Sequence, residues 1–291
     1  MSTVAETILA EAPRSNARRV LRRFLRNKAG VIGAVLVLSF VLIAIFAPYL
    51  ASYEPTRTNW IAVRKPPSAQ FLFGTDDLGR DTLSRLVYGA RASLLAGVVS
   101  VVIAFSIGVP IGMLSGYVGR WLDAAVMRVV DAVLAVPFLI FAIALSAFLG
   151  PSLTNAMIAI GISAAPLFAR LARGQTLVVK VEDYVEAARA IGAPHWIVLC
   201  RHIFPNVLPP LLVQATLSIA TAIIAEAALS FLGLGQQAPA PSWGSMLNVA
   251  RSFLAQAPWM AVFPGIAIFL TVLGFNLLGD GLHDALDPKD E

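Results

Sequence analysis

The sequence predicts an all-α membrane protein with six transmembrane helices. Of its 291 residues, 58% are hydrophobic and only 13% are charged, whereas soluble domains carry roughly a quarter charged residues. The mean hydropathy is +0.77. Its apolar runs are about twenty residues long, the length that a helix needs to cross a bilayer. A membrane β-barrel would show alternating segments of about ten residues instead, and the sequence has no such pattern.

The expected spans define the domain organisation. They lie at residues 31–50, 93–114, 126–149, 153–171, 208–232 and 259–278. We therefore expect a cytoplasmic segment 1–28, a first transmembrane helix 29–50, an extracytoplasmic loop 51–92, a five-helix core 93–278 with a cytoplasmic loop 172–207 and an outer loop 233–258, and a cytoplasmic tail 279–291. The sequence Gly150-Pro151 predicts a tight outer turn.

Basic residues predict the orientation. Seven of the 22 precede the first apolar run: Arg14, Arg18, Arg19, Arg22, Arg23, Arg26 and Lys28. This excess places the N-terminus in the cytoplasm, and an even number of spans returns the C-terminus there. Six basic residues in the loop 51–92 run against the rule. The first run is longer than the apolar part of a cleaved signal peptide, so we expect a retained signal-anchor.

Several enzymatic functions are excluded by missing motifs. None of the four lysines follows a glycine, so the chain lacks the Gly-Lys-Ser/Thr loop that cradles nucleotide phosphates. It has no HExxH and no GxSxG motif. A single cysteine, Cys200, excludes an internal disulfide framework. The sequence offers no catalytic residues, and we expect no cofactor on this chain.

Acidic residues provide two further candidate sites. Asp131 and Glu226 lie inside spans, where a carboxylate is costly and needs a partner. They are candidates for a translocation path or a proton relay, although interhelical hydrogen bonds or snorkelling explain them as well. Near the C-terminus, Asp280, His283, Asp284 and Asp287 share one helical face and could ligate a divalent metal. A solvated tail is the simpler explanation, and we expect no metal site.

A polar segment between the fourth and fifth spans predicts two short helices at a bend. Residues 182–191 have helical periodicity, with Tyr184, Ala188 and Ile191 on one face. Gly192 supplies a terminus, and a second helix from about His195 is expected to stop before Pro205. Such a knob could enter a groove on another protein, whereas a helix lying on lipid is the alternative.

This segment resembles the EAA signature of permease subunits in binding-protein-dependent ABC importers. Glu186, Ala187, Ala188, Gly192 and Pro205 match it in register, and the sequence HIFP departs from its Ile-x-Leu-Pro end. Four further stretches, FGTDDLGRDTLSRLVYGARASL, EAALSFLGLG, PSWGSML and GDGLHDALDP, together with the N-terminal RRFLRNKAGVIGA, are similar to the second permease of the dipeptide/oligopeptide/nickel group.

The resemblance implies a type I ABC importer permease in a bacterial cell membrane. It would pair with a second permease, two ATPase subunits or domains that hold ATP and Mg, and an extracytoplasmic substrate-binding protein. The implied ATPase contacts are Tyr184, Glu186, Ala187, Ala188, Arg189 and Gly192. The outer segments 74–91 and 233–258 suggest binding-protein contacts at Asp77, Arg80, Ser242 and Trp243, although both segments could merely cap the bundle.

The function expected from the sequence is therefore import of di- or oligopeptides at the cost of ATP hydrolysed by partners. A nickel chelate or a tetrapyrrole is an alternative cargo within the same family. An ion-coupled carrier that uses Glu226 and Asp131 is an alternative from another class, and a non-transporting scaffold is a third.

Overall fold

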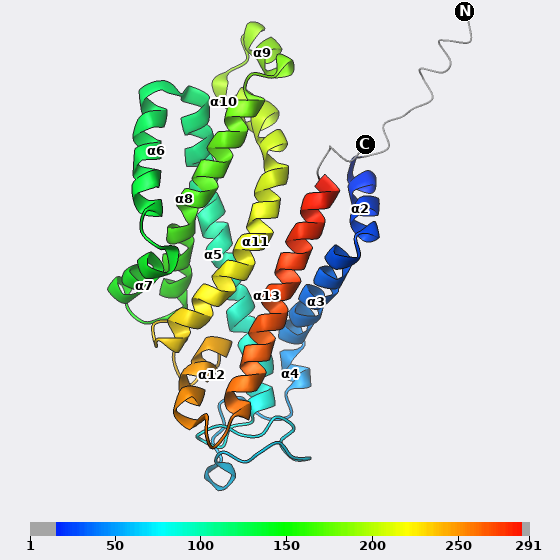
Figure 1. The fold of residues 1–291 in the computed structure, drawn as a ribbon, viewed down its shortest axis with the longest axis vertical. Helices are drawn as coiled ribbons and strands as arrows, with labels where there is room; N and C mark the ends of the chain where they lie inside the picture. The colour runs from blue at the N-terminus through cyan, green and yellow to red at the C-terminus, as the bar shows by residue number, and fades with distance from the viewer. Residues whose placement is uncertain (1–15, 287–291) are drawn as a thin grey trace, which may run out of the picture.

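The protein is an elongated helical bundle. The computed structural model describes residues 16–286, and within that range the regular structure is helical, apart from one isolated bridge between Thr75 and Asp81. Figure 1 shows α9 at one end of the bundle and α12 at the other, with the long helices running between them. The helices are α2 (Asn16–Arg26), α3 (Lys28–Ile45), α4 (Ala47–Leu50), η1 (Trp60–Ala62), α5 (Thr82–Val118), α6 (Arg120–Leu134), α7 (Phe138–Leu149), α8 (Leu153–Val179), α9 (Asp183–Ala190), α10 (His195–Ile197), η2 (Val198–Ile203), α11 (Phe204–Phe231), α12 (Trp243–Ala250), η3 (Arg251–Phe253) and α13 (Trp259–Leu286).

Small residues bring α5 and α8 into close contact. A Cβ atom added at Gly112 would lie 2.8 Å from the carbonyl carbon of Ala169, and one at Gly161 would lie 2.7 Å from the Cβ of Ile103. Glycine allows two backbones to approach closely, and dispersion forces can then hold helices together in lipid, where no hydrophobic force between helices operates. This pair forms the centre of the core.

A second close contact attaches the N-terminal helix. Gly33 on α3 faces α13, where an added Cβ would lie 2.7 Å from the carbonyl oxygen of Gly274. Gly30 on α3 and Gly281 on α13 approach each other in the same way. The helix α3 thus packs along α13 while most of its surface stays available to lipid (Figure 1).

The third expected span is not one helix. Residues 126–149 form parts of α6 and α7, which meet at an angle of 88°. Pro137 lies at the break and precedes α7. Proline lacks the N–H group that would continue α6, and it disfavours helical geometry at Val136 before it. Residues 16–286 therefore contain five helices long and apolar enough to span a membrane, or six if this bent pair counts as one span.

Several expected boundaries were also wrong. The helix α5 begins at Thr82, because the side chain of Asp81 accepts a hydrogen bond from Ser84 N and caps it, so the last part of the predicted loop 51–92 is helical. The helix α8 continues to Val179, and α13 continues to Leu286 into the predicted tail 279–291. Gly150, with φ of 92°, makes the predicted turn between α7 and α8.

Ion pairs order the segment between α4 and α5. The Arg80 Nε atom lies 2.6 Å from Asp76 Oδ2, and the Arg85 Nε atom lies 3.3 Å from the same oxygen. All three side chains are at least nine-tenths buried. A buried charge is tolerated only when it is paired, and this cluster fixes the loop against the end of α5.

We predict that Gly33→Leu separates α3 from α13. The new side chain has no space beside Gly274, and overpacking of this kind costs on the order of 2 kcal/mol. We expect the Tm of the detergent-solubilised protein to fall by about 5 °C.

The matched control is Gly265→Leu. Gly265 also lies in a long helix, α13, but an added Cβ would meet no atom within 4 Å. Equal Tm values for the two variants would contradict the packing argument.

Candidate functional site

The predicted bend between the fourth and fifth spans is present. At the end of α9, the N–H of Gly192 donates to Arg189 O at 2.9 Å, and the N–H of Ala193 donates to Ala188 O at 3.1 Å. Gly192 has φ of 81°, the left-handed conformation that glycine adopts at little cost. These two bonds form the Schellman motif that ends a helix, so the prediction for Gly192 as a helix terminus is confirmed.

The face of α9 predicted from the sequence holds both exposed and buried side chains. The residues that α9 buries are Val185 and Ala188, whereas Tyr184 and Ile191 are exposed. Glu186 and Ala187 are exposed as well. Among the predicted ATPase contacts, Ala188 therefore packs inward and supports the helix.

Two exposed apolar residues near the bend were not among the predicted ATPase contacts. Ile191 is 86% exposed and Trp196 is 67% exposed, one on each side of the bend. A large apolar side chain that folding leaves open is a common feature of a protein–protein contact. The sequence signal was the position of these two large apolar residues next to Gly192 and Pro194.

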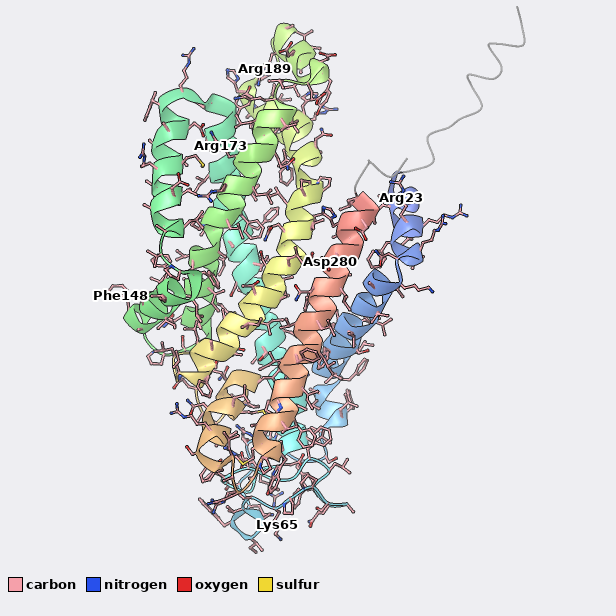
Figure 2. All side chains as sticks on the ribbon, viewed as in Figure 1. Arg23, Lys65, Phe148, Arg173, Arg189 and Asp280 are labelled. Atoms are coloured by element: carbon pink, nitrogen blue, oxygen red, sulfur yellow. The ribbon has the colours of Figure 1, made fainter. Side chains whose placement is uncertain are left out.

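The loop is anchored to the end of α5. The hydroxyl of Tyr117 lies 2.7 Å from His195 Nδ1 in a hydrogen bond. The guanidinium of Arg189 sits over the Tyr117 ring, 4.9 Å from its centroid, which is cation–π geometry. Arg189, a predicted ATPase contact, therefore has a partner within this chain. Figure 2 shows Arg189, a residue of α9, at the opposite end of the molecule from Lys65.

The second short helix does not stop before Pro205. Residues His195–Phe231 run as one continuous helical segment of 37 residues, in which Val198–Ile203 have π-helical bonding. Pro205 lies in the first turn of α11, directly after the π-helical residues. The bend and the fifth span are therefore parts of one element.

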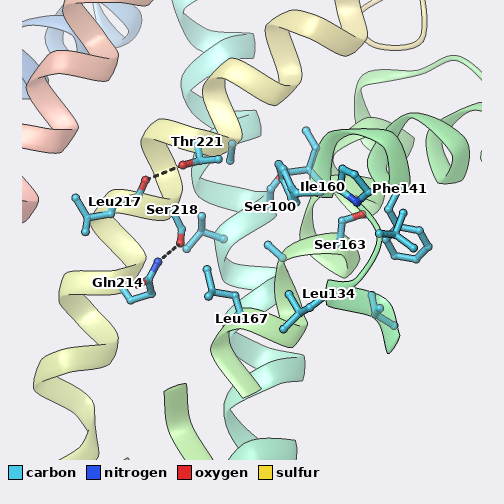
Figure 3. Close-up of a pocket in the computed structure, with 17 residues that line it drawn as sticks. Ser100, Leu134, Phe141, Ile160, Ser163, Leu167, Gln214, Leu217, Ser218 and Thr221 are labelled. Atoms are coloured by element: carbon cyan, nitrogen blue, oxygen red, sulfur yellow. Dashed lines mark hydrogen bonds between the residues drawn. The ribbon is translucent and has the colours of Figure 1, made fainter. Parts of the chain in front are cut away.

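A cavity of about 330 Å³ lies between α5, α8, α11 and the α6–α7 break. Its polar lining consists of Ser100, Ser163, Gln214, Ser218 and Thr221, and its other lining residues are apolar (Figure 3). The Nε2 atom of Gln214 donates to Ser218 Oγ at 3.1 Å. The cavity is thus lined by neutral groups that can donate and accept hydrogen bonds, with no charge to select an ion.

Neither predicted intramembrane acid lines this cavity. Asp131 lies on α6, is 59% exposed, and forms an ion pair with Arg170 of α8. Glu226 is fully buried on α11, where it accepts hydrogen bonds from Ser93 Oγ at 3.0 Å and Ser230 Oγ at 2.7 Å. Ser93 Oγ also accepts a bond from Trp243 N at 3.3 Å. Glu226 thus connects α11, α5 and α12, and its role on a translocation path stays a prediction.

Most of the predicted binding-protein contacts are buried. Ser242 and Trp243 have no exposed surface, and Arg80 is 5% exposed because it pairs with Asp76. Only Asp77 retains a partly open side chain. Trp243 fills the space between α5 and α12, and its Nε1 atom donates to Leu86 O at 3.0 Å. At this end, Trp60 and Ile61 are more exposed, at 72% and 87%.

The acidic residues of α13 form no metal site in the described part of the chain. Residues 16–286 hold no group of three or more His, Cys, Asp or Glu side chains that could bind a metal. His283 Nδ1 and Asp284 Oδ1 are 3.8 Å apart. Asp287, the fourth candidate, lies outside the described residues.

The comparisons with known proteins agree on one family. Residues 108–289 match the model described as "Binding-protein-dependent transport system inner membrane component", and residues 15–67 match the "N-terminal TM domain of oligopeptide transport permease C". The solved structure of the inward-facing MetNI methionine ABC transporter aligns with a TM-score of 0.56 and 24% identity, over 70% of this chain and 97% of that chain. The structural match shows a shared fold.

Three curated relatives match over most of their length. The dipeptide transport system permease DppC of Alkalihalophilus pseudofirmus is 48% identical, over 94% of this chain and 90% of its own. The probable D,D-dipeptide permease DdpC of Escherichia coli K12 is 48% identical, over 89% and 87%. The glutathione permease GsiD of Pectobacterium atrosepticum is 44% identical, over 99% and 96%.

We predict that Tyr117→Phe loosens the bend. Loss of the hydroxyl removes the bond to His195, which contributes about 1 kcal/mol. Amide hydrogen exchange in residues 183–203 should become about fivefold faster, because local opening costs less.

Tyr53→Phe is the matched control, since it removes a 3.2 Å hydroxyl bond to Gln70 O near the α12 end. It should leave exchange in residues 183–203 unchanged. Unaltered exchange in Tyr117→Phe would show that this anchor is dispensable.

Proposed function

Because this chain belongs to the binding-protein-dependent inner membrane components of ABC importers, we propose that it forms half of an import path for short peptides. Members of the family are multi-pass permease subunits, and ATP hydrolysis resides in separate subunits. The chain is therefore a transport subunit and not an enzyme. The observation that carries the proposal is the continuous segment His195–Phe231, which joins the exposed bend to the cavity lining.

The peptide cargo is supported by two observations. The names of the relatives described above identify them as permeases for dipeptides, a D,D-dipeptide and glutathione. The cavity offers hydroxyl and amide groups without charge, which suit the N–H and C=O groups common to all peptides. A nickel chelate or a tetrapyrrole remains the alternative cargo. A cavity selective for cations would instead be expected to carry carboxylates.

The bend is proposed to contact an ATPase subunit. Tyr184, Glu186, Ala187 and Ile191 present an exposed face there, with Arg189 and Ala188 as internal supports. Partial desolvation raises the pKa of Tyr184, and the nearby Glu182 charge adds to this rise. ATP and Mg would be bound by the ATPase partner. Closure of that partner favours one arrangement of the permease only if the closed partner binds this arrangement more tightly than the other.

The remaining partners and the orientation follow the same proposal. A second permease would complete the path, and an extracytoplasmic binding protein would deliver peptides at the α12 end. The α9 end would face the cytoplasm, in agreement with the N-terminal basic residues. Both ends of the chain would then be cytoplasmic.

An ion-coupled carrier is less well supported. A proton relay needs acidic groups along an accessible path, whereas Glu226 is enclosed by Ser93 and Ser230 and Asp131 is paired with Arg170 away from the cavity. The family and the relatives favour the ABC permease.

We predict that Gly192→Val uncouples ATP hydrolysis from uptake. An added Cβ at Gly192 meets no atom within 4 Å, so the effect comes from φ of 81° alone, at about 1–2 kcal/mol for an L-residue. The helix end must then rearrange and move the exposed face of α9. In proteoliposomes with the partner subunits, peptide uptake per ATP hydrolysed should fall at least tenfold.

The control is Gly150→Val, because Gly150 has φ of 92° and comparably open surroundings but lies in the turn before α8. It imposes at least as much strain, because Gly150 also has ψ of 157°, a region that is essentially restricted to glycine, and it should keep the ratio of uptake to hydrolysis. A normal ratio in Gly192→Val would refute the coupling role of the bend.

We also predict that Ser218→Leu impairs uptake by narrowing the cavity and removing a hydroxyl group. Uptake at saturating peptide should fall roughly tenfold, a cost of about 1.4 kcal/mol, while assembly with the ATPase stays normal. Ser39→Leu, on the exposed face of α3, is the matched control. Full uptake in Ser218→Leu would mean that the cargo does not pass this cavity.

A further inference from the structure

The helix α2 has a composition that the transport mechanism does not explain. Its sequence NARRVLRRFLR contains five arginines and no acidic residue. Lys28 follows at the start of α3. So many positive charges on one short helix repel one another. This repulsion costs free energy unless negatively charged groups lie nearby.

The arginines and leucines of α2 lie on adjoining faces. Leu21 and Leu25 are four residues apart and are 57% and 62% exposed. Arg22 and Arg26 are also four apart and are exposed. One residue advances a helix by about 100°, so the arginine row lies next to the leucine row. This pattern is typical of a helix that lies at a membrane surface.

The leucine row continues the lipid-facing surface of α3. Ile32, Val35 and Leu38 of α3 are 55%, 58% and 56% exposed, as expected for side chains in contact with acyl chains. Leu21 and Leu25 add exposed apolar side chains on the N-terminal side of Lys28. The continuity with a lipid contact favours lipid as the neighbour of α2.

The junction between α2 and α3 holds this helix in place. The side chain of Asn27 accepts a hydrogen bond from Gly30 N at 2.9 Å and donates to Asp284 Oδ2 of α13 at 2.7 Å. The ring of Phe24 lies against Gly30 and Gly281, where an added Cβ would meet it at 3.1–3.2 Å. Figure 1 shows α2 beside the end of α13, to which it is also linked by contacts. The basic face is therefore presented in a fixed direction.

From these observations we propose that α2 binds anionic phospholipid headgroups, with Arg22 and Arg26 on the phosphates and Leu21 and Leu25 among the upper acyl carbons. Guanidinium groups pair with phosphate through two parallel hydrogen bonds. The inference uses the orientation proposed above, in which this end meets the anionic cytoplasmic leaflet. It makes α2 a lipid-selective anchor for the α3–α13 pair.

The test measures lipid binding and does not depend on transport. The full chain in neutral detergent is titrated with phosphatidylglycerol and, separately, with phosphatidylcholine of the same acyl chains. Each basic residue near an anionic surface contributes roughly fivefold in affinity. Arg22→Gln/Arg26→Gln should therefore lower the preference for phosphatidylglycerol by tenfold or more, and 0.5 M salt should weaken the wild-type preference.

The control is Arg128→Gln/Arg201→Gln, which makes the same charge change at two exposed arginines of α6 and η2. It should retain the preference, with an unchanged Tm in both double variants. The proposal is overturned if the wild type does not prefer phosphatidylglycerol, or if both double variants lose the preference equally. It is also overturned if Arg22→Gln/Arg26→Gln leaves the lipid preference intact but prevents copurification of the ATPase subunits, because the basic face would then belong to a protein partner. Loss of lipid preference with normal uptake would leave the proposed function standing.

Discussion

The close contact between α5 and α8 is the constraint on which the rest of the structure depends. Glycines at 108, 112 and 161 allow the two backbones to meet without intervening side chains, and in lipid such packing replaces the hydrophobic force. Both helices then serve as supports. The helix α5 carries Tyr117 at the α9 end and Ser93 nearer the α12 end, whereas α8 carries Arg173, which forms an ion pair with Asp123 of α6 at 2.6 Å.

Polar interactions are concentrated at the two ends of this pair. At the α12 end, Glu226 joins α11 to α5, and Trp243 is held against the same helix. At the α9 end, Lys180 Nζ donates to Gly116 O at 2.7 Å and Tyr117 bonds to His195. Between them, the cavity has only neutral polar groups. Hydrogen bonds thus fix both ends of the α5–α8 pair, whereas the cavity between them is lined by neutral polar and apolar side chains.

The sequence predicted the features that depend on local chemistry. The lengths of the apolar runs predicted the membrane spans, and Gly192 predicted the end of α9. The sequence could not show which proline interrupts a helix. Pro110 and Pro166 lie within continuous helices, whereas Pro137 separates two helices. The difference depends on which neighbours satisfy the freed carbonyl groups, which is a property of the packed bundle. The sequence also did not show which residues of α9 pack inward, because Val185 belongs to a core cluster built by residues from other helices.

The segment His195–Phe231 is easiest to bend between the bend and the cavity lining. Its 37 residues span roughly 55 Å at 1.5 Å per residue. Pro209 and Pro210 remove the N–H groups that would bond to the carbonyls of Pro205 and Asn206, and the π-helical turn lies just before them. Bending is easiest where helical bonds are missing. The part of the segment that bends most easily therefore lies between the bend and Gln214, whereas the part beyond it is bonded to α5 through Glu226.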